Sequence, residues 1–365
     1  MSKYLVVVAG PTASGKTKVG IELAKHFDTE ILSADSRQFY KEMNVGTAKP
    51  SKEELAEVKH HFIDTLSIKK DYSAGDYERD ALKKLTKLFK KKDVVVMAGG
   101  SGLFIQAVTE GLNEFPEVPE GIRADLTAEY EKHGLWKLQK ELKESDPDYY
   151  QFVDLTNHQR LIRALEICRA TGQPYSSFRN QPKKERDFET IFVVLKRDRE
   201  ALYDRINMRV DLMMRDKLHK EVEGLLEKRE LNALQTVGYQ EFFGYFDEDY
   251  DIYEAIRLVK RNSRRYAKRQ LTWFKKVEGA KFIDAEDMDA ILAYIEARIA
   301  GEVEAPTTPE VEERAAPPTP IKGEEKAATE TNDAVETEEE EEDEDWNIED
   351  EFQLPSINDD LSHLD

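Results

Sequence analysis

The stretch GPTASGKT, residues 10–17, directly follows the apolar run YLVVVA at residues 4–9. Its spacing, G-x-x-x-x-G-K-T, is that of a phosphate-binding loop, in which backbone amides and a lysine surround an anion at the start of a helix. The helical pattern TKVGIELAKHF follows at once, so strand, loop and helix come in the required order. The residues predicted to bind phosphates are Gly10, Pro11, Thr12, Ala13, Ser14, Gly15, Lys16 and Thr17.

Further short β-branched runs are typical of buried strands, and helical patterns separate them. The three runs are EILSA (30–34), DVVVMA (93–98) and TIFVVL (190–195). Strands that alternate with helices favour a parallel sheet covered on both faces. We therefore predict an α/β fold with a P-loop NTPase-like core, whose first part is residues 1–112 and whose second, mostly helical part is residues 188–300.

The alternation stops between residues 113 and 187. Short helical patterns follow one another there, and the last of them, residues 157–172, begins with Asn157 as an N-cap and ends at Gly172. We predict an all-helical domain inserted into the core over these residues.

The acidic charge of the chain is concentrated at one end. The formal net charge of the 365 residues is −21, and residues 301–365 contain 24 acidic and three basic residues. The remaining 51 acidic and 51 basic residues leave residues 1–300 neutral. The acidic segment cannot bury enough apolar surface to offset its ordering entropy, so we predict a disordered tail.

Cysteine content and hydropathy bound the class of protein. The single cysteine, Cys168, excludes an internal disulfide and a cysteine-based zinc site. No apolar run approaches the roughly 20 residues of a membrane span, and no signal peptide opens the chain. We expect a soluble, cytoplasmic protein that does not bind membranes.

Polar side chains follow two of the predicted strands. Asp35 follows the second run, and Ser101 follows the third, which ends without an acid. Such strand ends line the ligand crevice of open α/β sheets. Asp35 fits a metal ligand, a general base or a cap for a following helix.

Two arginines lie on or beside an apolar helical stripe. In residues 199–214, Arg209 falls on the stripe of Leu202, Ile206 and Met213, and Arg205 lies at its edge. An inward-facing arginine needs an anionic partner, which is either a structural carboxylate or a bound phosphate.

Two basic helical faces are candidate nucleic-acid contacts. Gln159, Arg160 and Arg163 share one face of the last inserted helix, which could equally be an ordinary solvated face. Residues 257–276 carry nine basic residues and no acid, interleaved with Tyr266, Trp273 and Phe274. This stretch is either a basic amphipathic helix or a surface for nucleic acid or another polyphosphate, and in both cases we expect its aromatic residues to face the core.

The motifs as a set resemble the tRNA isopentenyltransferase family, the tRNA dimethylallyltransferases. They occur in order over residues 4–285: GPTASGKT, SADSRQFY, GTAKP, HHFID, AGGSGLF, RLIRALEI, TVGYQEF and AKRQLTWF. The acidic tail departs from the usual bacterial pattern, and the zinc-finger extension of some eukaryotic members is absent. The resemblance implies that dimethylallyl diphosphate donates its prenyl group to the exocyclic amine of the adenosine on the 3′ side of a tRNA anticodon, and that pyrophosphate leaves.

The resemblance also implies roles for individual residues. Lys16 and Arg209 neutralise the leaving group, Thr17 lies near Mg²⁺, and Asp35 is the general base. Ser101 stands where the family often has threonine. The residues implied to contact tRNA are Asp35, Ser36, Arg37, Gln38, Ser101, Arg123, Gln159, Arg160, Leu161, Ile162, Arg163, Gln235, Thr236, Val237, Gly238, Tyr239 and Gln240. We expect a monomer whose partner is the anticodon stem-loop of tRNA. A small-molecule P-loop kinase and a non-catalytic RNA-binding module are the alternatives.

Overall fold

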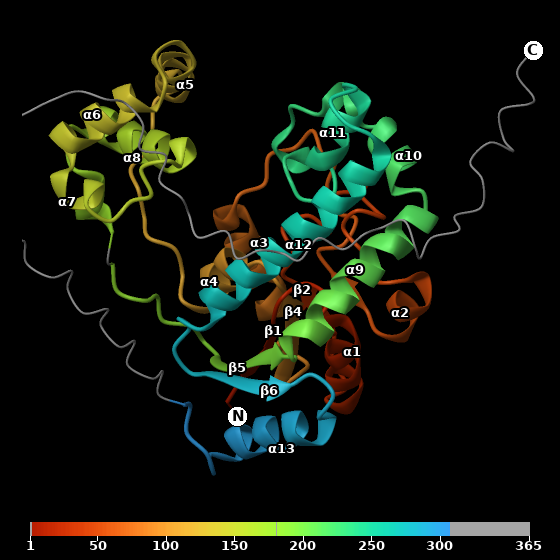
Figure 1. The fold of residues 1–365 in the computed structure, drawn as a ribbon. Coiled ribbons are helices and arrows are strands. Elements are labelled where there is room, and N and C mark those ends of the chain that lie inside the picture. Colours follow the sequence, from red (N-terminus) through yellow and green to blue (C-terminus); the bar gives the residue numbers. More distant parts are fainter. Residues whose placement is uncertain (1, 180, 307–365) are drawn as a thin grey trace, which may run out of the picture. The chain divides into compact units, whose positions relative to one another are not determined.

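The computed structural model describes residues 2–179 and 181–306, which belong to one compact unit (Figure 1). None of the described helices is long and apolar enough to cross a membrane. Most of the predicted acidic tail, from residue 307 onward, lies outside the described residues.

Across the described residues, six parallel strands form one sheet in the order β3-β2-β4-β1-β5-β6. The strands are β1 (Tyr4–Ala9), β2 (Ile31–Ser33), β3 (His60–His61), β4 (Val94–Gly99), β5 (Glu189–Lys196) and β6 (Ala280–Asp284). The phosphate-binding loop follows β1, which lies between β4 and β5. This arrangement confirms the predicted α/β class.

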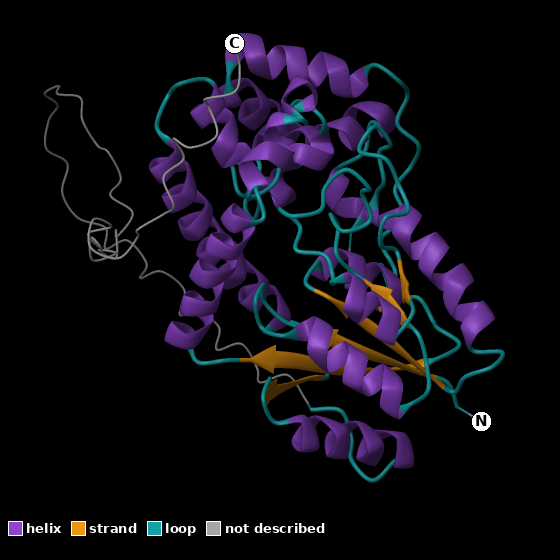
Figure 2. Ribbon diagram, turned by 90° about the vertical axis from the view of Figure 1, so that its right-hand side faces the viewer, coloured by secondary structure: helices purple, strands orange, loops and turns teal. Residues whose placement is uncertain are grey.

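Helices cover both faces of the sheet (Figures 1 and 2). Alternate residues of β1 point to opposite cores, with Leu5 and Val7 in one cluster and Val6 and Val8 in the other. Helices α1 and α13 pack on the second face, whereas α3, α4 and the helices from α9 to α12 contribute to the first. The helices of the core are α1 (Lys16–His26), α2 (Lys52–Glu57), α3 (Ala74–Leu88), α4 (Gly102–Thr109), α9 (Arg199–Arg215), α10 (Leu218–Glu223), α11 (Gln240–Phe246), α12 (Ile252–Phe274) and α13 (Met288–Ala300).

The inserted segment is helical, as predicted. Its elements are α5 (Ile122–His133), α6 (Leu135–Ser145), α7 (Pro147–Tyr150), α8 (His158–Thr171) and a 3₁₀ turn (Tyr175–Phe178). Asn157 caps α8 by accepting from the backbone N–H of Arg160, and Gly172 ends it with a φ of 70°. These helices share a separate apolar cluster, centred on Leu126, Leu138 and Leu165. That cluster supports the predicted insertion, whose limits at residues 113 and 187 stay a prediction.

The sheet contains two edge strands that the sequence analysis missed. β3 is two histidines long, and β6 (AKFID) carries one buried residue, Ile283. Neither shows the β-branched run that marks a buried strand, since an edge strand buries fewer side chains. Residues 280–284 are thus a strand within the segment that we predicted to be mostly helical.

Candidate functional site

The phosphate-binding loop has a backbone that few side chains allow. Gly10 has a φ of 152°, and a Cβ there would lie 2.9 Å from the Ser14 Oγ and 3.0 Å from the Leu195 carbonyl oxygen. Ala13 adopts a left-handed φ of 62°, and Gly15, with a φ of 105°, begins α1. Strained backbone of this kind is typical of sites where the chain wraps a ligand.

Arginines from outside the loop fix its carbonyl and hydroxyl groups. Arg209 donates to the Thr12 Oγ1 at 3.0 Å, and Arg205 donates to the Ala13 carbonyl at 2.9 Å. Both extend from α9, which lies beside α12 (Figure 1). Arg197, at the end of β5, donates to the Ser14 carbonyl at 2.9 Å. The cationic side chains therefore converge on the predicted anion site.

Lys16 is half-buried among these cations. Burial lowers its pKa to about 7, and the nearby Arg209 guanidinium adds to the effect, while Asp35 opposes it. Its ammonium group donates to the Pro11 carbonyl at 2.6 Å. Burial also lowers the pKa of Arg209. A bound polyanion would relieve both penalties because it supplies the missing negative charge.

Asp35 lies at the carboxyl end of β2 and holds a tight turn. Its Oδ1 accepts from the backbone N–H groups of Arg37 at 2.9 Å and Gln38 at 3.3 Å. Residues 36–39 form a turn, so the alternative interpretation of Asp35 as a helix cap is wrong. Both bonds involve Oδ1, and Oδ2 remains for a ligand in the cavity that Asp35 lines.

Ser101 joins the ends of β2 and β4. Its Oγ accepts from the Ser36 backbone N–H at 2.9 Å, and Tyr266 of α12 lies beside it. Burial and the nearby Asp35 raise the pKa of Tyr266 to about 12, so this phenol stays neutral at physiological pH. The prediction that the aromatic residues of 257–276 face the core is confirmed for Phe274, which is buried. It is wrong for Trp273, which is 39% exposed, and for Tyr266, which lines the site.

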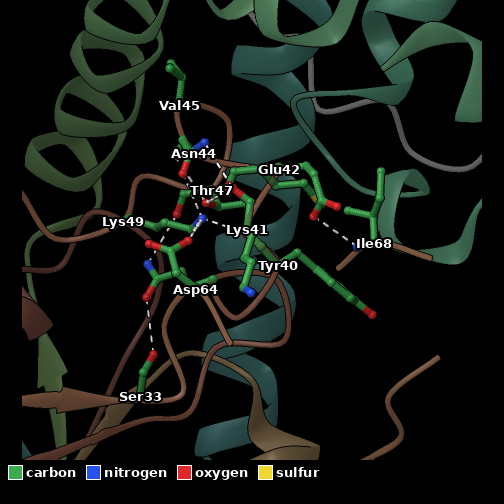
Figure 3. A network of polar contacts seen from close by, with 12 residues as sticks. Ser33, Tyr40, Lys41, Glu42, Asn44, Val45, Thr47, Lys49, Asp64 and Ile68 are labelled. Atoms are coloured by element: carbon green, nitrogen blue, oxygen red, sulfur yellow. Dashed lines mark hydrogen bonds and ion pairs between the residues drawn. The ribbon is translucent and has the colours of Figure 1, made fainter. Parts of the chain in front are cut away.

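A network of polar contacts holds the loop that follows Asp35 (Figure 3). The buried Lys49 ammonium binds Asp64, the Tyr40 carbonyl at 2.7 Å and the Asn44 Oδ1 at 2.9 Å. Gln38, predicted to contact tRNA, donates to the carbonyls of residues 47 and 48, each at 3.2 Å. Its amide therefore supports the loop.

Two glutamates that the sequence analysis did not single out anchor the neighbouring loops. The Glu221 carboxylate accepts from the backbone N–H groups of residues 44–46 and from the Tyr239 hydroxyl at 2.6 Å. Glu241 is 6% exposed and accepts from the Gly238 N–H and the Asn262 Nδ2, both at 2.8 Å. Sequence spacing carried no signal for these carboxylates, since their partners are mostly backbone groups.

Residues predicted to bind the prenyl donor and residues predicted to bind its acceptor line one cavity of about 770 Å³. This volume is suited to a small ligand together with a nucleobase. Asp35 faces it from β2, and Gln270 and Tyr266 from α12. The predicted site residues that line it are Thr12, Ala13, Gly15, Lys16, Thr17, Asp35, Ser36, Arg37, Gln38, Arg209, Gln235, Thr236, Val237, Gly238 and Gln240. Tyr239 is fully buried, so its predicted contact with tRNA is corrected to a supporting role.

The predicted site residues of the inserted helices do not line this cavity. Leu161 and Ile162 are buried in the apolar cluster of the insertion, so their predicted contact with tRNA is wrong. Gln159 and Arg160 are exposed, which keeps that face available. Arg123 forms a two-pronged ion pair with the buried Glu166, with N–O distances of 2.5 and 2.9 Å. It therefore has a structural partner.

The basic stretch at residues 257–276 forms most of α12 and two residues beyond it. Part of its charge is compensated, because Lys260 pairs with Asp211 at 2.7 Å and Arg257 pairs with Glu254 at 2.7 Å. The expectation of nine uncompensated cations is therefore corrected. Apart from these two ion-paired residues, five basic residues of the stretch are exposed: Arg265, Lys268, Arg269, Lys275 and Lys276.

Comparison with known proteins identifies close relatives. Residues 38–277 match the family described as "IPP transferase". The chain is 54% identical over 300 residues to a tRNA dimethylallyltransferase of Christiangramia forsetii, covering 82% of this chain and 99% of that protein. It is 50% identical to the enzyme of that name from Flavobacterium johnsoniae, covering 80% and 97% of the two chains. Among solved structures it is similar to the tRNA isopentenylpyrophosphate transferase of Bacillus halodurans, with 36% identity, a TM-score of 0.61 and coverage of 83% and 97%.

Proposed function

Because this chain belongs to the IPP transferase family, we propose that it transfers a dimethylallyl group from dimethylallyl diphosphate to an adenosine of tRNA. The observation that carries the proposal is the meeting of the phosphate-binding loop with Asp35 in one cavity. The loop suits the diphosphate of the donor, and Asp35 lines the same cavity and can act as a base for the acceptor. The kinase and the non-catalytic module are disfavoured by the named relatives.

The leaving group determines what the loop does. Cleavage of the bond between the prenyl carbon and oxygen leaves pyrophosphate, on which negative charge develops in the transition state. Lys16 and Arg209 hold that charge, and the amides of the loop add oriented dipoles. The loop therefore keeps the phosphates while the carbon fragment moves to the acceptor.

The described residues of this site offer few protein ligands for a divalent cation. Among the described residues no group of three or more His, Cys, Asp or Glu side chains is arranged to hold a metal ion. Mg²⁺ binds readily through one protein ligand, substrate phosphates and water. We propose that the Thr17 hydroxyl is that ligand, and that the ion adds charge neutralisation to the leaving diphosphate.

The acceptor amine determines what Asp35 does. An amine conjugated with an aromatic ring is a poor nucleophile, so its proton must leave as the new carbon–nitrogen bond forms. The Asp35 carboxylate accepts this proton while the adenine ring is held in line with the prenyl carbon. A stacked base cannot enter the cavity, so the adenosine must be extruded from its loop. We propose the exocyclic amine of the adenosine on the 3′ side of the anticodon as acceptor.

The exposed basic residues at the end of and just beyond α12 and the Gln159–Arg160 face are proposed to contact the anticodon stem-loop, because cations and amides there can bind phosphates. We further propose a monomeric enzyme that acts in the cytoplasm, where tRNA is found.

Incubation with labelled dimethylallyl diphosphate and unmodified tRNA, followed by nucleoside analysis, tests the function. We expect a prenylated adenosine and one pyrophosphate for each nucleoside formed. Release of ADP from ATP in the presence of a small acceptor, without prenyl transfer, would contradict the proposal.

A further inference from the structure

Gln270 is a buried polar side chain that the catalytic steps described above do not use. It lies near the end of α12 and is 7% exposed. Its amide makes two bonds: Nε2 donates to the Gly100 carbonyl at 2.9 Å, and Oε1 accepts from the Thr12 N–H at 2.9 Å. Both halves of the amide are satisfied, which buried polar groups require.

These two bonds join the ends of neighbouring strands. Thr12 lies in the loop after β1, and Gly100 directly follows β4. A Cβ at Gly100 would lie 2.3 Å from the Gln270 Nε2, so a side chain there would displace the amide. The glycine therefore permits a close approach that brings α12 onto the phosphate-binding loop.

The second contact of Thr12 leads to Arg209. The Thr12 backbone N–H binds Gln270 of α12, while its Oγ1 accepts from Arg209 of α9 at 3.0 Å. One loop residue thus lies between the two helices that flank the cavity. Movement of Thr12 would displace the guanidinium that faces the diphosphate.

The same face of α12 also reaches the acceptor side. Tyr266 precedes Gln270 by four residues, so both lie on one face of the helix. Tyr266 lies beside Ser101, which holds the turn after Asp35. One face of α12 therefore lies against both the phosphate-binding loop and the turn that follows Asp35.

The geometry points to Gln270 as a positioning residue that holds the phosphate-binding loop, and through Thr12 the Arg209 guanidinium, in the arrangement that binds the diphosphate of the donor. This inference rests on the proposed function and deepens it. Gln270 acts through Thr12 and does not itself contact the reacting atoms.

The test compares Gln270→Leu and Gln270→Glu with the wild-type protein. Leucine keeps the volume and removes both bonds. Misplacement of the loop should raise the KM for dimethylallyl diphosphate by about tenfold or more, and the tRNA KM should change less than twofold. The Kd for inorganic pyrophosphate, measured by calorimetry with Mg²⁺, should rise in parallel.

The second variant separates positioning from folding. A protonated carboxyl can accept from Thr12 and donate to Gly100, as the amide does, whereas an ionised one cannot donate. Burial favours the protonated form, so activity relative to wild type should recover as the pH falls from about 8 to about 6. Gln270→Leu should show no recovery. Lys16, Asp35, Arg209 and Tyr266 line the same cavity and are present in every protein, so each activity is compared with that of the wild type at the same pH, and Gln270→Leu controls for their titration.

Gln106→Leu is the matched control. Gln106 lies on α4, and its amide donates at 3.2 Å to Glu110, which follows the last residue of that helix. This variant should keep the wild-type KM for the donor. An unchanged donor KM and pyrophosphate Kd in Gln270→Leu would overturn the inference, as would equal loss of donor and tRNA binding. Absence of transfer by the wild-type protein would instead contradict the proposed function.

Discussion

Arginines serve different partners in the cavity and in the inserted helices. In the cavity, Arg205 and Arg209 donate to neutral oxygens of the phosphate-binding loop. In the insertion, Arg123 and Arg169 form two-pronged ion pairs with internal carboxylates, Glu166 for the first and Glu129 and Glu141 for the second. The cavity thus keeps its positive charge for a ligand, while the insertion uses these charges to hold its helices together.

The comparison corrects a simple assumption about arginines in this chain. From the sequence we predicted for both Arg123 and Arg209 an anion from a substrate: tRNA for Arg123, from the family resemblance, and the diphosphate for Arg209. The structure gives Arg123 a carboxylate that is 4% exposed and gives Arg209 a hydroxyl. Substitutions at the two positions should therefore affect different measured quantities.

The largest effect is expected at Asp35. Asp35→Asn keeps an oxygen to accept from the N–H groups of Arg37 and Gln38, so the turn should persist while the base is lost. We expect the rate of the chemical step to fall by about 10²-fold or more in single-turnover experiments at saturating substrates. The Kd for pyrophosphate should change little. A wild-type rate would mean that another group accepts the proton.

A smaller effect, on donor binding, is expected at Arg209. Arg209→Ala removes a cation aimed at the diphosphate and should raise the donor KM, lower kcat, or both, with a combined loss of about 30-fold. The affinity for tRNA should stay near the wild-type value. If Arg209 were needed only for folding, the melting temperature would fall and the donor would show no selective defect.

The titration of Lys16 predicts a pH effect on anion binding. Its pKa in the free protein is about 7, and a bound polyanion favours the charged form. Above pH 7 binding must therefore take up a proton, so the Kd for pyrophosphate should rise with pH, by at most about tenfold per unit. Calorimetry in buffers of different ionisation enthalpy measures the proton uptake. Lys16→Met, which has no titrating group there, should lack both the uptake and this part of the pH dependence.

The smallest effects are expected in the insertion, where substitutions of two arginines, Arg123 and Arg160, can be compared. Arg123→Ala leaves the buried Glu166 without its main partner and should lower the free energy of unfolding by about 1–3 kcal/mol. Arg160→Ala removes an exposed cation, and should leave stability unchanged while weakening tRNA binding by a few-fold at low salt. Loss of tRNA affinity in Arg123→Ala without loss of stability would contradict this assignment.

Local sequence patterns predicted the parts of the site that lie on one segment of chain. Residues 10–17 carry a fixed spacing, Asp35 and Ser101 follow apolar strands, and Arg209 falls on an apolar stripe. Each of these patterns lies within a few helical turns or one strand, so these residues can be predicted without knowledge of any long-range contact.

The missed residues depend on contacts between distant segments. Gln270 meets Thr12 across 258 positions of sequence, and Glu221 meets backbone groups near residue 45. A backbone partner leaves no residue type to recognise. The prediction that Leu161 contacts tRNA was wrong for a different reason. The stretch 159–163 was carried over as a whole from the family resemblance, and it includes buried positions that support the exposed ones.

The most direct measurement of the central claim follows the prenyl carbon and the phosphorus of the donor separately. Dimethylallyl diphosphate labelled in both groups is incubated with the protein, Mg²⁺ and unmodified tRNA, and both labels are located after nucleoside digestion. If the loop holds the diphosphate as a leaving group, the prenyl label appears in an adenosine and all of the phosphorus label appears as free pyrophosphate. Phosphorus label in the tRNA, or prenyl transfer that is unaffected by Arg209→Ala and Asp35→Asn, would contradict the account.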